Sequence, residues 1–340
     1  MKTVLITLLV FGVIIMIHEM GHFVAAKLFG IKVNEFSLGM GPSFFRYTRG
    51  ETDYRLRLLP IGGFVAMEGE NEDSGDDRAF CNKPAWQRFI VLAAGAFMNL
   101  VLGLILVLVL VGRMELIGTT TIANFYPEAA SSQWLQQGDT ILRVNGYSVN
   151  GYNDALFQMV RDQDSVIDFE VVRDGQNVAL QGVAFDTKEG TDGLKTLVLD
   201  FQFYGREKTF FNSLDYAVDW TVSIVKQVWY SLGDIITGKY GINQLSGPVG
   251  TSSAIGEAAS AGMQSLLLLV SFITINVGVF NLLPVPALDG GRLLFVLIEM
   301  VIRRPIPQRF EGFIHAAGFA LLMGLVVLIT FNDIVRVFFR

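Results

Sequence analysis

Four stretches of the chain are apolar over the length that a membrane-spanning helix requires. A bilayer core about 30 Å thick is crossed by roughly 20 residues of helix. These stretches are residues 4–30, 89–112, 265–283 with a continuation at 293–302, and 313–331. Residues 284–291, "PVPALDGG", interrupt the third stretch, and its prolines cannot continue a regular helix. We therefore predict a polytopic α-helical membrane protein with four transmembrane helices, the third of them broken.

The segment between the second and third stretches has a different pattern. Short alternating runs such as "TILRV" and "DFEVV" are typical of strands, and Asn145-Gly146 and Asp174-Gly175 are typical of tight hairpin turns. About ninety residues suffice for one small domain. We predict an inserted α+β domain here. Residues 213–238, which follow it, mix aromatic and aliphatic residues with charges and predict an amphipathic interfacial helix.

A further polar segment lies between the first two stretches. Residues 54–70, "YRLRLLPIGGFVAMEGE", alternate at their start, and Gly62-Gly63 is a candidate turn. We predict a membrane-associated β-hairpin that turns at these glycines. The predicted organisation is then an N-terminal membrane core at 1–113, the inserted domain at 114–204, the amphipathic helix and a linker at 205–262, and a C-terminal membrane core at 263–340.

Basic residues in short loops predict which side of the membrane each loop faces. Arg303, Arg304 and Arg309 lie in the loop before the fourth stretch, which places that loop in the cytoplasm. The hairpin then lies on the cytoplasmic side, and the inserted domain is extracytoplasmic. Arg336 and Arg340 at the opposite end of the last stretch oppose this orientation.

Composition supports the membrane assignment and excludes several function classes. Hydrophobic residues make up 51% of the 340, charged residues only 17%, and the mean hydropathy is +0.46. Cys81 is the single cysteine, so neither an intramolecular disulfide nor a multi-cysteine zinc site can form. A net charge of -6 offers no basic surface for nucleic acid. The expected surroundings are a lipid bilayer, with no nucleic acid partner.

Ionisable residues within the first apolar stretch indicate chemistry, because such residues are costly in a membrane span. His18, Glu19 and His22 form an H-E-x-x-H pattern. On a helix, the two histidines at i and i+4 share one face and can bind one zinc ion, while the glutamate can reach a water on the same metal. The pattern predicts a metal-dependent hydrolase.

A catalytic zinc site needs a third protein ligand and an open position. The candidates are His315 in the fourth apolar stretch and the acidic residues near the other stretches, of which Asp289, at the break in the third, is placed best. Irregular backbone at membrane depth is tolerated beside a cavity, which favours Asp289. The alternative for Asp289 is a helix N-cap, and for His315 an interhelical hydrogen bond.

Two motifs in this order resemble those of a known family. "HEMGH" at 18–22, "NLLPVPALDGG" at 281–291, and a small domain between the second and third spans are similar to the bacterial site-2 proteases, zinc intramembrane metalloproteases that cut membrane-anchored anti-sigma factors. The resemblance implies zinc (Zn2+) as the cofactor, His18, His22 and Asp289 as its ligands, and Glu19 as the general base.

The resemblance also implies substrate-binding and partner-binding features. The implied substrate-binding residues are Asn281, Pro284, Gly62, Gly63, Phe64 and Val65, the last four in a β-loop that pairs with an extended substrate. Residues 127–149 resemble a bacterial PDZ domain, whose partner would be a peptide ligand. There is room for one PDZ domain, whereas some family members carry two in tandem.

The function implied is that of a zinc-dependent intramembrane endopeptidase in the bacterial plasma membrane. Its substrates would be single-pass membrane proteins such as anti-sigma factors or remnant signal peptides, cut in or near their transmembrane helix by an active site toward the cytoplasmic side. A catalytically silent membrane zinc protein and a PDZ scaffold are the alternatives. A scaffold would not need Glu19 beside the two histidines. A zinc transporter or sensor would need polar residues on several spans, but the second stretch offers only Asn99 and the fourth mainly His315.

Overall fold

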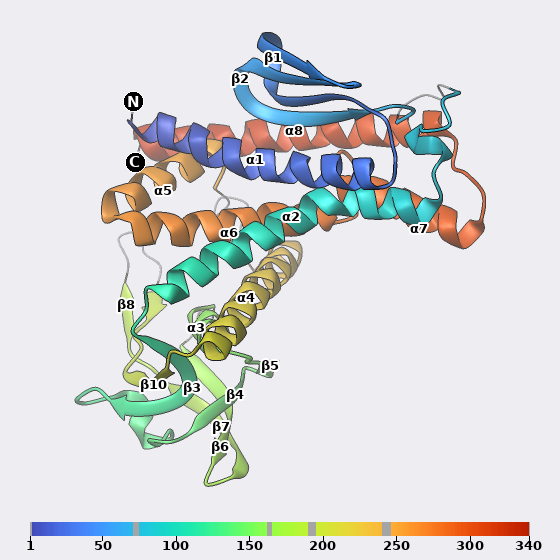
Figure 1. Ribbon diagram of the computed structural model, residues 1–340. Coiled ribbons are helices and arrows are strands. Elements are labelled where there is room, and N and C mark those ends of the chain that lie inside the picture. Colours follow the sequence, from blue (N-terminus) through green and yellow to red (C-terminus); the bar gives the residue numbers. More distant parts are fainter. Residues whose placement is uncertain (1, 71–74, 162–164, 190–194, 240–245, 340) are drawn as a thin grey trace. The chain divides into compact units, whose positions relative to one another are not determined.

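The computed structural model describes residues 2–70, 75–161, 165–189, 195–239 and 246–339. The chain forms two compact units, one of residues 1–106 with 230–340 and the other of residues 107–229 (Figure 1). The first unit contains the two histidines of the H-E-x-x-H pattern and the interrupted apolar stretch.

Among the described residues, four helices are long and apolar enough to cross a membrane, as the sequence predicts. They are α1 (Lys2–Leu28), α2 (Ala85–Gly112), α6 (Met263–Leu282) and α8 (Gln308–Phe339). Large apolar side chains on them are exposed, for example Leu5 at 64% and Leu321 at 76%. Exposed apolar side chains over whole helices are expected where lipid is the solvent.

Small residues allow α1, α2 and α6 to approach closely. A Cβ at Gly21 of α1 would lie 2.9 Å from the Cα of Gly95 in α2, and a Cβ at Gly278 of α6 would lie 3.0 Å from the carbonyl oxygen of Ala96. Helices in membranes associate through such contacts because no hydrophobic force draws apolar surfaces together in lipid. α2 therefore lies between the helix that carries the histidines and the helix that leads to Asp289.

The third apolar stretch is broken, as predicted. α6 ends at Leu282, and α7 (Asp289–Ile302) begins after a short loop. The loop folds back on α7, since a Cβ at Gly290 would lie 2.6 Å from the carbonyl carbon of Leu283. Only glycine leaves room for this approach, which explains why a glycine pair follows the aspartate.

The β-hairpin is present, but its turn is not at Gly62-Gly63. Strand β1 (Val33–Arg49) pairs antiparallel with β2 (Thr52–Met67), and the turn is at residues 50–51. Gly62 lies within β2 with φ 79°. A left-handed glycine there bends the strand and re-aims it, which the sequence pattern does not distinguish from a turn.

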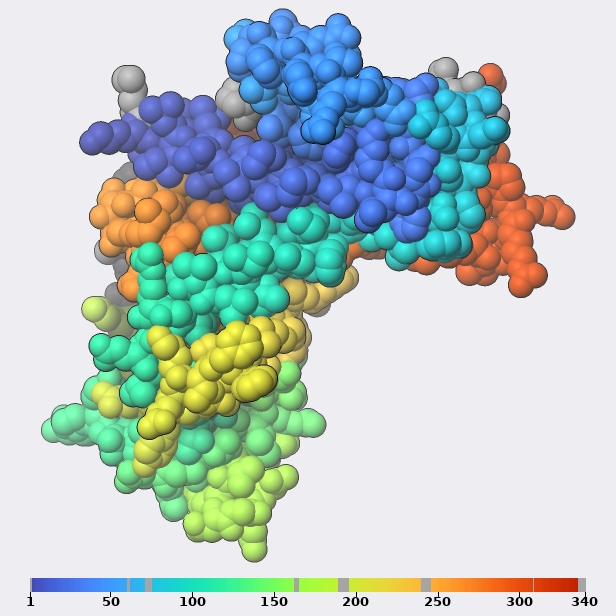
Figure 2. Space-filling view, viewed as in Figure 1, coloured from blue at the N-terminus to red at the C-terminus, as the bar shows by residue number. Residues whose placement is uncertain are grey.

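The bend makes the hairpin curl so that β1 is paired on both sides. Glu35 of β1 faces both Asp53 and Ala66 of β2. Residues 63–67 thereby become an outer edge of the sheet, and the hairpin lies over α1 (Figure 2). A short 3-10 helix, η1 (Phe80–Asn82), precedes α2.

Helix α5 (Pro248–Ala261) packs against the N-terminal half of α1. Ile255 packs with Val10 and Ile14 in one buried cluster. The backbone N–H of Gly250, in the first turn of α5, donates to the Asp333 carboxylate of α8 at 2.8 Å. A carboxylate at a helix N-terminus satisfies an otherwise unpaired N–H group and complements the helix dipole.

The second unit combines short antiparallel strands with one short helix. The strands are β3 (Leu116–Phe125), β4 (Thr140–Val144), β5 (Tyr147–Ser148), β6 (Val166–Arg173), β7 (Gln176–Ala184) and β10 (Phe201–Glu207), with a separate pair β8 (Thr187–Glu189) and β9 (Lys195–Leu197). The main sheet has the order β10-β3-β4-β6-β7, and β5 pairs with β4. η2 (Ala130–Gln133) and α3 (Tyr152–Val160) complete the fold.

Both predicted hairpin turns in this unit are confirmed. Asn145 and Gly146 have φ 49° and 78°, and Asp174 and Gly175 have φ 50° and 78°. Positive φ at both central residues is the type I′ turn that matches the twist of the flanking strands. The core between sheet and helix contains Phe169, Phe201, Ile141 and Met159, among others.

Helix α4 (Phe210–Ile236) occupies the region predicted to be an amphipathic helix. Within the second unit, its Ser223 and Lys226 both bind the buried Asp154 of α3, at 3.0 and 2.9 Å. Phe210 and Phe211 on the same helix are more than three-quarters exposed. The helix is therefore amphipathic, with one face held to α3 by an ion pair whose carboxylate is buried.

Candidate metal centre

Three side chains with metal-binding atoms meet between α1 and α7. His18 and His22 are one turn apart on α1, and Asp289 is the first residue of α7. Asp289 Oδ2 lies 3.0 Å from His18 Nε2 and 3.2 Å from His22 Nε2, and the two Nε2 atoms are 3.2 Å apart. Ligands at about 2.0–2.1 Å from a tetrahedral zinc ion lie roughly 3.3 Å from one another. The triangle formed by Asp289 Oδ2 and the two Nε2 atoms therefore has nearly the dimensions of one face of a tetrahedral zinc site.

The chemistry of the triangle fits a divalent metal ion better than a hydrogen-bonded cluster. Asp289 Oδ2 is buried and has no hydrogen-bond partner among the described residues. A buried carboxylate oxygen without a donor is costly, and a cation at the centre of the triangle would satisfy it. Two imidazoles and one carboxylate leave a fourth position open, as in catalytic zinc sites.

His22 is held with its Nε2 toward the centre of the triangle. Its Nδ1 lies 2.8 Å from the carbonyl oxygen of Val91 in α2. Because a carbonyl oxygen only accepts hydrogen bonds, Nδ1 must be the donor. The proton is therefore on Nδ1, and the Nε2 lone pair is free for a metal. A hydrogen bond of this kind fixes the tautomer and ring orientation of a ligating histidine.

Asn99 supplies the corresponding contact for His18. Its side-chain amide lies 3.3 Å from His18 Nδ1, and Asn99 is completely buried. The amide oxygen has no partner in the orientation with Nδ2 on the imidazole; the opposite orientation lets Oδ1 accept from Nδ1–H. Sequence reasoning gave Asn99 no role, although its polarity within an apolar span was a signal.

Asp289 reaches the imidazoles because it does not cap its helix. Leu288 is the N-cap of α7, and Asp289 stands at the first helical position. The structure thus places the carboxylate in the cluster instead of in the alternative role of N-cap. His315, the other candidate ligand, lies outside the cluster, and its Nδ1 accepts a hydrogen bond from the backbone N–H of Ala287.

Glu19 lies beside the cluster in a cleft of about 170 Å³. Its Cγ packs against Gly63 of the hairpin, where a Cβ would lie 3.0 Å away. The cleft is lined by His18, Glu19, His22, Phe64, Val65, Met67, Glu70, Leu92, Asp289 and Arg292. A carboxylate, a candidate metal position and the edge of a sheet therefore share one cavity.

Only some of the predicted substrate-binding residues lie at the cleft. Phe64 and Val65 line the cleft, and Gly63 borders it at Glu19. Gly62 lines a different, apolar groove of about 570 Å³ between α1 and the hairpin. Among the described residues that line the cleft, neither Asn281 nor Pro284 occurs. The Asn281 amide donates instead to the carbonyl oxygen of Val277 in its own helix, at 3.0 Å.

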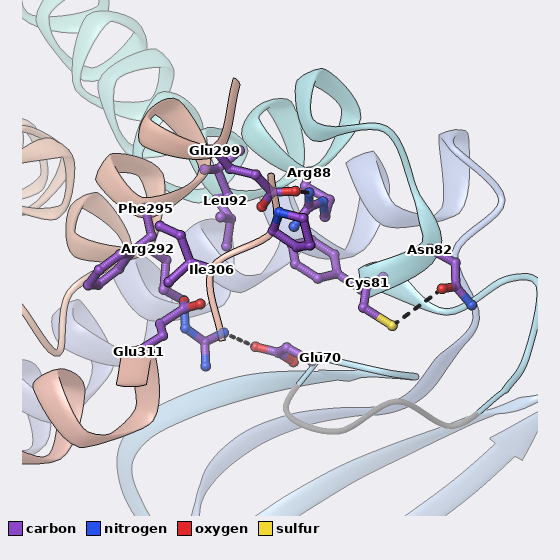
Figure 3. A pocket seen from close by; sticks show the side chains of 13 residues that line it. Glu70, Cys81, Asn82, Arg88, Leu92, Arg292, Phe295, Glu299, Ile306 and Glu311 are labelled. Carbon is purple, nitrogen blue, oxygen red and sulfur yellow. Dashed lines mark hydrogen bonds and ion pairs between the residues drawn. The ribbon is translucent and has the colours of Figure 1, made fainter. Parts of the chain in front are cut away.

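A polar chamber of about 420 Å³ adjoins the cleft and shares Glu70, Leu92 and Arg292 with it (Figure 3). Arg292 projects from α7 and binds Glu70, at the end of the hairpin. Arg88 binds Glu299 at 2.5 Å on the far wall. Charged side chains therefore line a cavity that borders the cleft at Glu70 and Arg292.

Comparison with known proteins agrees with this chemistry. Residues 6–325 match the model of peptidase family M50. A Clostridium perfringens protein whose name assigns it as a zinc metalloprotease is 36% identical over 98% of this chain and 98% of its own length. The zinc metalloprotease RasP of Bacillus licheniformis is 30% identical over 99% of this chain and 100% of its own.

The regulator of sigma-W protease RasP of Bacillus subtilis is 28% identical over 99% of both chains. The family match covers both the histidine pair on α1 and the aspartate on α7, and the apolar helices agree with a membrane protein. The chain therefore belongs to peptidase family M50, the site-2 proteases, and is a multi-pass membrane metalloprotease.

Proposed function

We propose that the protein is a zinc-dependent intramembrane endopeptidase in which His18, His22 and Asp289 hold the metal and Glu19 is the general base. The observation that carries this proposal is the convergence of three ligand atoms within 4.8 Å of one another, beside Glu19 in the same cleft. A base must lie within reach of the water it deprotonates, and the i, i+1 placement of Glu19 after His18 provides that reach.

The bound zinc would polarise the scissile carbonyl and lower the pKa of a water molecule toward about 7. The protein's own groups do the rest. Glu19 accepts the proton of the attacking water and delivers it to the nitrogen of the departing amine. Val91 and Asn99 keep the two imidazoles in the orientation that leaves Nε2 free.

The edge of the hairpin sheet is the proposed binding surface for the scissile segment. Residues 63–65 each pair with one residue of β1, at Leu38, Ser37 and Phe36. Among the described residues, no second strand pairs with them, and Phe64 and Val65 line the cleft. A transmembrane helix hides its amides in internal hydrogen bonds and must unwind before hydrolysis. An extended segment can then add to this edge as a further strand.

The apolar groove beside the hairpin offers a place for the rest of the substrate span. On α1 it is lined by Leu8, Leu9, Gly12, Val13 and Met16, and from the hairpin mainly by Leu38, Phe44, Leu56 and Leu58. Because Met16 is one helical turn before Glu19, the groove runs along α1 toward the cleft. A lipid-soluble segment that lies in this groove would reach the base at its end.

The proposed substrates are single-pass membrane proteins, either anti-sigma factors or remnant signal peptides. The name of the B. subtilis relative, regulator of sigma-W protease, supports the anti-sigma factor class. We place the protein in the bacterial plasma membrane with the active site toward the cytoplasm, as Arg303, Arg304 and Arg309 suggest. Residues 114–204 would act as an extracytoplasmic PDZ-like domain for a peptide ligand, for which the sheet and α3 supply the required element types.

The test compares the native chain with Glu19→Gln in detergent, measuring zinc content and cleavage of a single-pass membrane substrate. Zinc should bind in both, and only the native chain should cleave, because glutamine leaves the three ligands intact but cannot accept a proton. Cleavage by Glu19→Gln at the native rate would refute the assignment of the base. Absence of zinc from the native chain would refute the metal site.

A further inference from the structure

His315 touches the loop that presents Asp289 without touching the metal-binding cluster itself. It lies on α8, and its Nδ1 is 2.9 Å from the backbone nitrogen of Ala287. Ala287 stands two residues before Asp289 in the chain. Among the described residues, His315 is outside the cluster of His18, His22 and Asp289, and it contacts the backbone of the loop that leads to Asp289.

The backbone at Ala287 is strained. Its φ is 75°, in the left-handed region that non-glycine residues rarely adopt. A residue persists in such a conformation only when its surroundings impose it. The hydrogen bond from the Ala287 N–H to His315 is one constraint that favours this conformation, and it acts at the residue where the chain turns toward α7.

The hydrogen bond also determines how His315 uses its two nitrogens. Since Nδ1 accepts from a backbone N–H, the neutral ring carries its proton on Nε2. Nε2 is buried and lies 3.8 Å from Glu311 Oε1, one turn earlier on α8. The lone pair that could bind a metal is thus already engaged by Ala287.

Helix α8 shapes the rest of the loop as well. A Cβ at Gly318 would lie 2.9 Å from the carbonyl oxygen of Pro286, so the loop rests directly on the helix backbone. A Cβ at Gly291 would lie 3.1 Å from His315 Cε1, and the Phe295 ring lies 5.8 Å from the imidazole. The imidazole is consequently wedged between the loop and α7.

We infer that His315 is a positioning residue, which holds Ala287 in its left-handed conformation and thereby aims the Asp289 carboxylate at the two imidazoles. The inference rests on the proposed function, because it takes Asp289 as a metal ligand. It assigns the third histidine of the chain a role outside the metal's own coordination. Groups that orient a ligand in this way typically change metal affinity 10–100-fold when removed.

The test measures zinc affinity of the full-length chain in detergent by competition with a chelating dye, for the native chain, His315→Leu and His315→Asn. Leucine removes the acceptor, and zinc should bind about 10–100-fold more weakly. The asparagine Oδ1 can accept in place of Nδ1, so His315→Asn should bind within a few-fold of native. The visible absorption spectrum of the Co²⁺ form should be unchanged in His315→Asn, because the ligand set stays the same.

A second-site variant distinguishes positioning from a general loss of structure. Glycine adopts φ 75° without steric cost, so Ala287→Gly in the His315→Leu background should recover most of the lost zinc affinity. Native zinc affinity in His315→Leu would overturn the inference and leave the proposed function intact. The inference would also be overturned if the Co²⁺ spectrum changed in His315→Asn and Ala287→Gly did not restore zinc affinity in His315→Leu. Both results are expected of a residue that binds the metal directly. A native chain that binds no zinc would overturn the proposed function, and the inference with it.

Discussion

Replacing Gly95 with alanine should weaken zinc binding while leaving the helices assembled. A Cβ at this position of α2 would lie 2.7 and 2.8 Å from Cε1 and Cδ2 of His22 and would overlap Nε2. Side-chain contacts shorter than about 3.0 Å are essentially never seen, so the imidazole must move away from α2 by several tenths of an ångström. Metal–ligand distances tolerate only about 0.2 Å.

The displacement would also lengthen the 2.8 Å hydrogen bond between His22 Nδ1 and the carbonyl oxygen of Val91. Loss of such an orienting bond alone weakens metal binding about 10–100-fold. We therefore expect Gly95→Ala to bind zinc at least tenfold more weakly than the native chain, and to lose cleavage with it. The assay is zinc affinity by dye competition, together with thermal unfolding in detergent.

Gly103→Ala is the matched control. It lies on the same helix, and its Cβ would meet Ile275 of α6 at a similarly short distance, 2.9 Å from Cδ1, away from the cluster. Overpacking in a tight interface costs about 1–3 kcal/mol in either variant. Both variants should thus lose similar stability, but only Gly95→Ala should bind zinc more weakly than the native chain. Equal zinc affinity in the two variants would refute the geometry argued for His22.

Two predictions concern stability away from the cluster. Burial raises the pKa of Tyr216 on α4 to about 12, above the unfolded value of about 10. Because the folded state keeps the Tyr216 proton to higher pH, the free energy of unfolding should fall by about 2–3 kcal/mol as pH rises from 10 to 12. Urea unfolding at several pH values should show this fall, and an equal fall in Tyr216→Phe would contradict the prediction. Asp333→Ala removes the acceptor for the Gly250 N–H and should destabilise the first unit by about 1–2 kcal/mol in thermal unfolding. Asp333→Asn keeps an acceptor oxygen and should lose less stability. Equal stability of Asp333→Ala and the native chain would contradict the role of Asp333 as a cap for α5.

Much of the fold could be predicted from local sequence patterns. The four long apolar helices are confirmed because a run of about 20 apolar residues has few other stable arrangements in a membrane. The Asn145-Gly146 and Asp174-Gly175 turns are confirmed because both residues of each pair tolerate positive φ. The glycine pair at 62–63 was wrong as a turn, since a bend within a strand and a turn between strands use glycine for the same reason.

The sequence by itself determined that His18, Glu19 and His22 would stand together, because a helix places i and i+4 on one face whatever surrounds it. The break in the third apolar stretch favoured Asp289 over His315 as their partner, but no local pattern could place either residue, more than 260 residues away, beside the two histidines. The tertiary structure brings Asp289 to the two imidazoles and places His315 against the backbone N–H of Ala287. The contacts of Asn99 and Val91 are likewise products of helix packing. Only tertiary structure brings such distant groups within hydrogen-bonding distance, because no local periodicity links them.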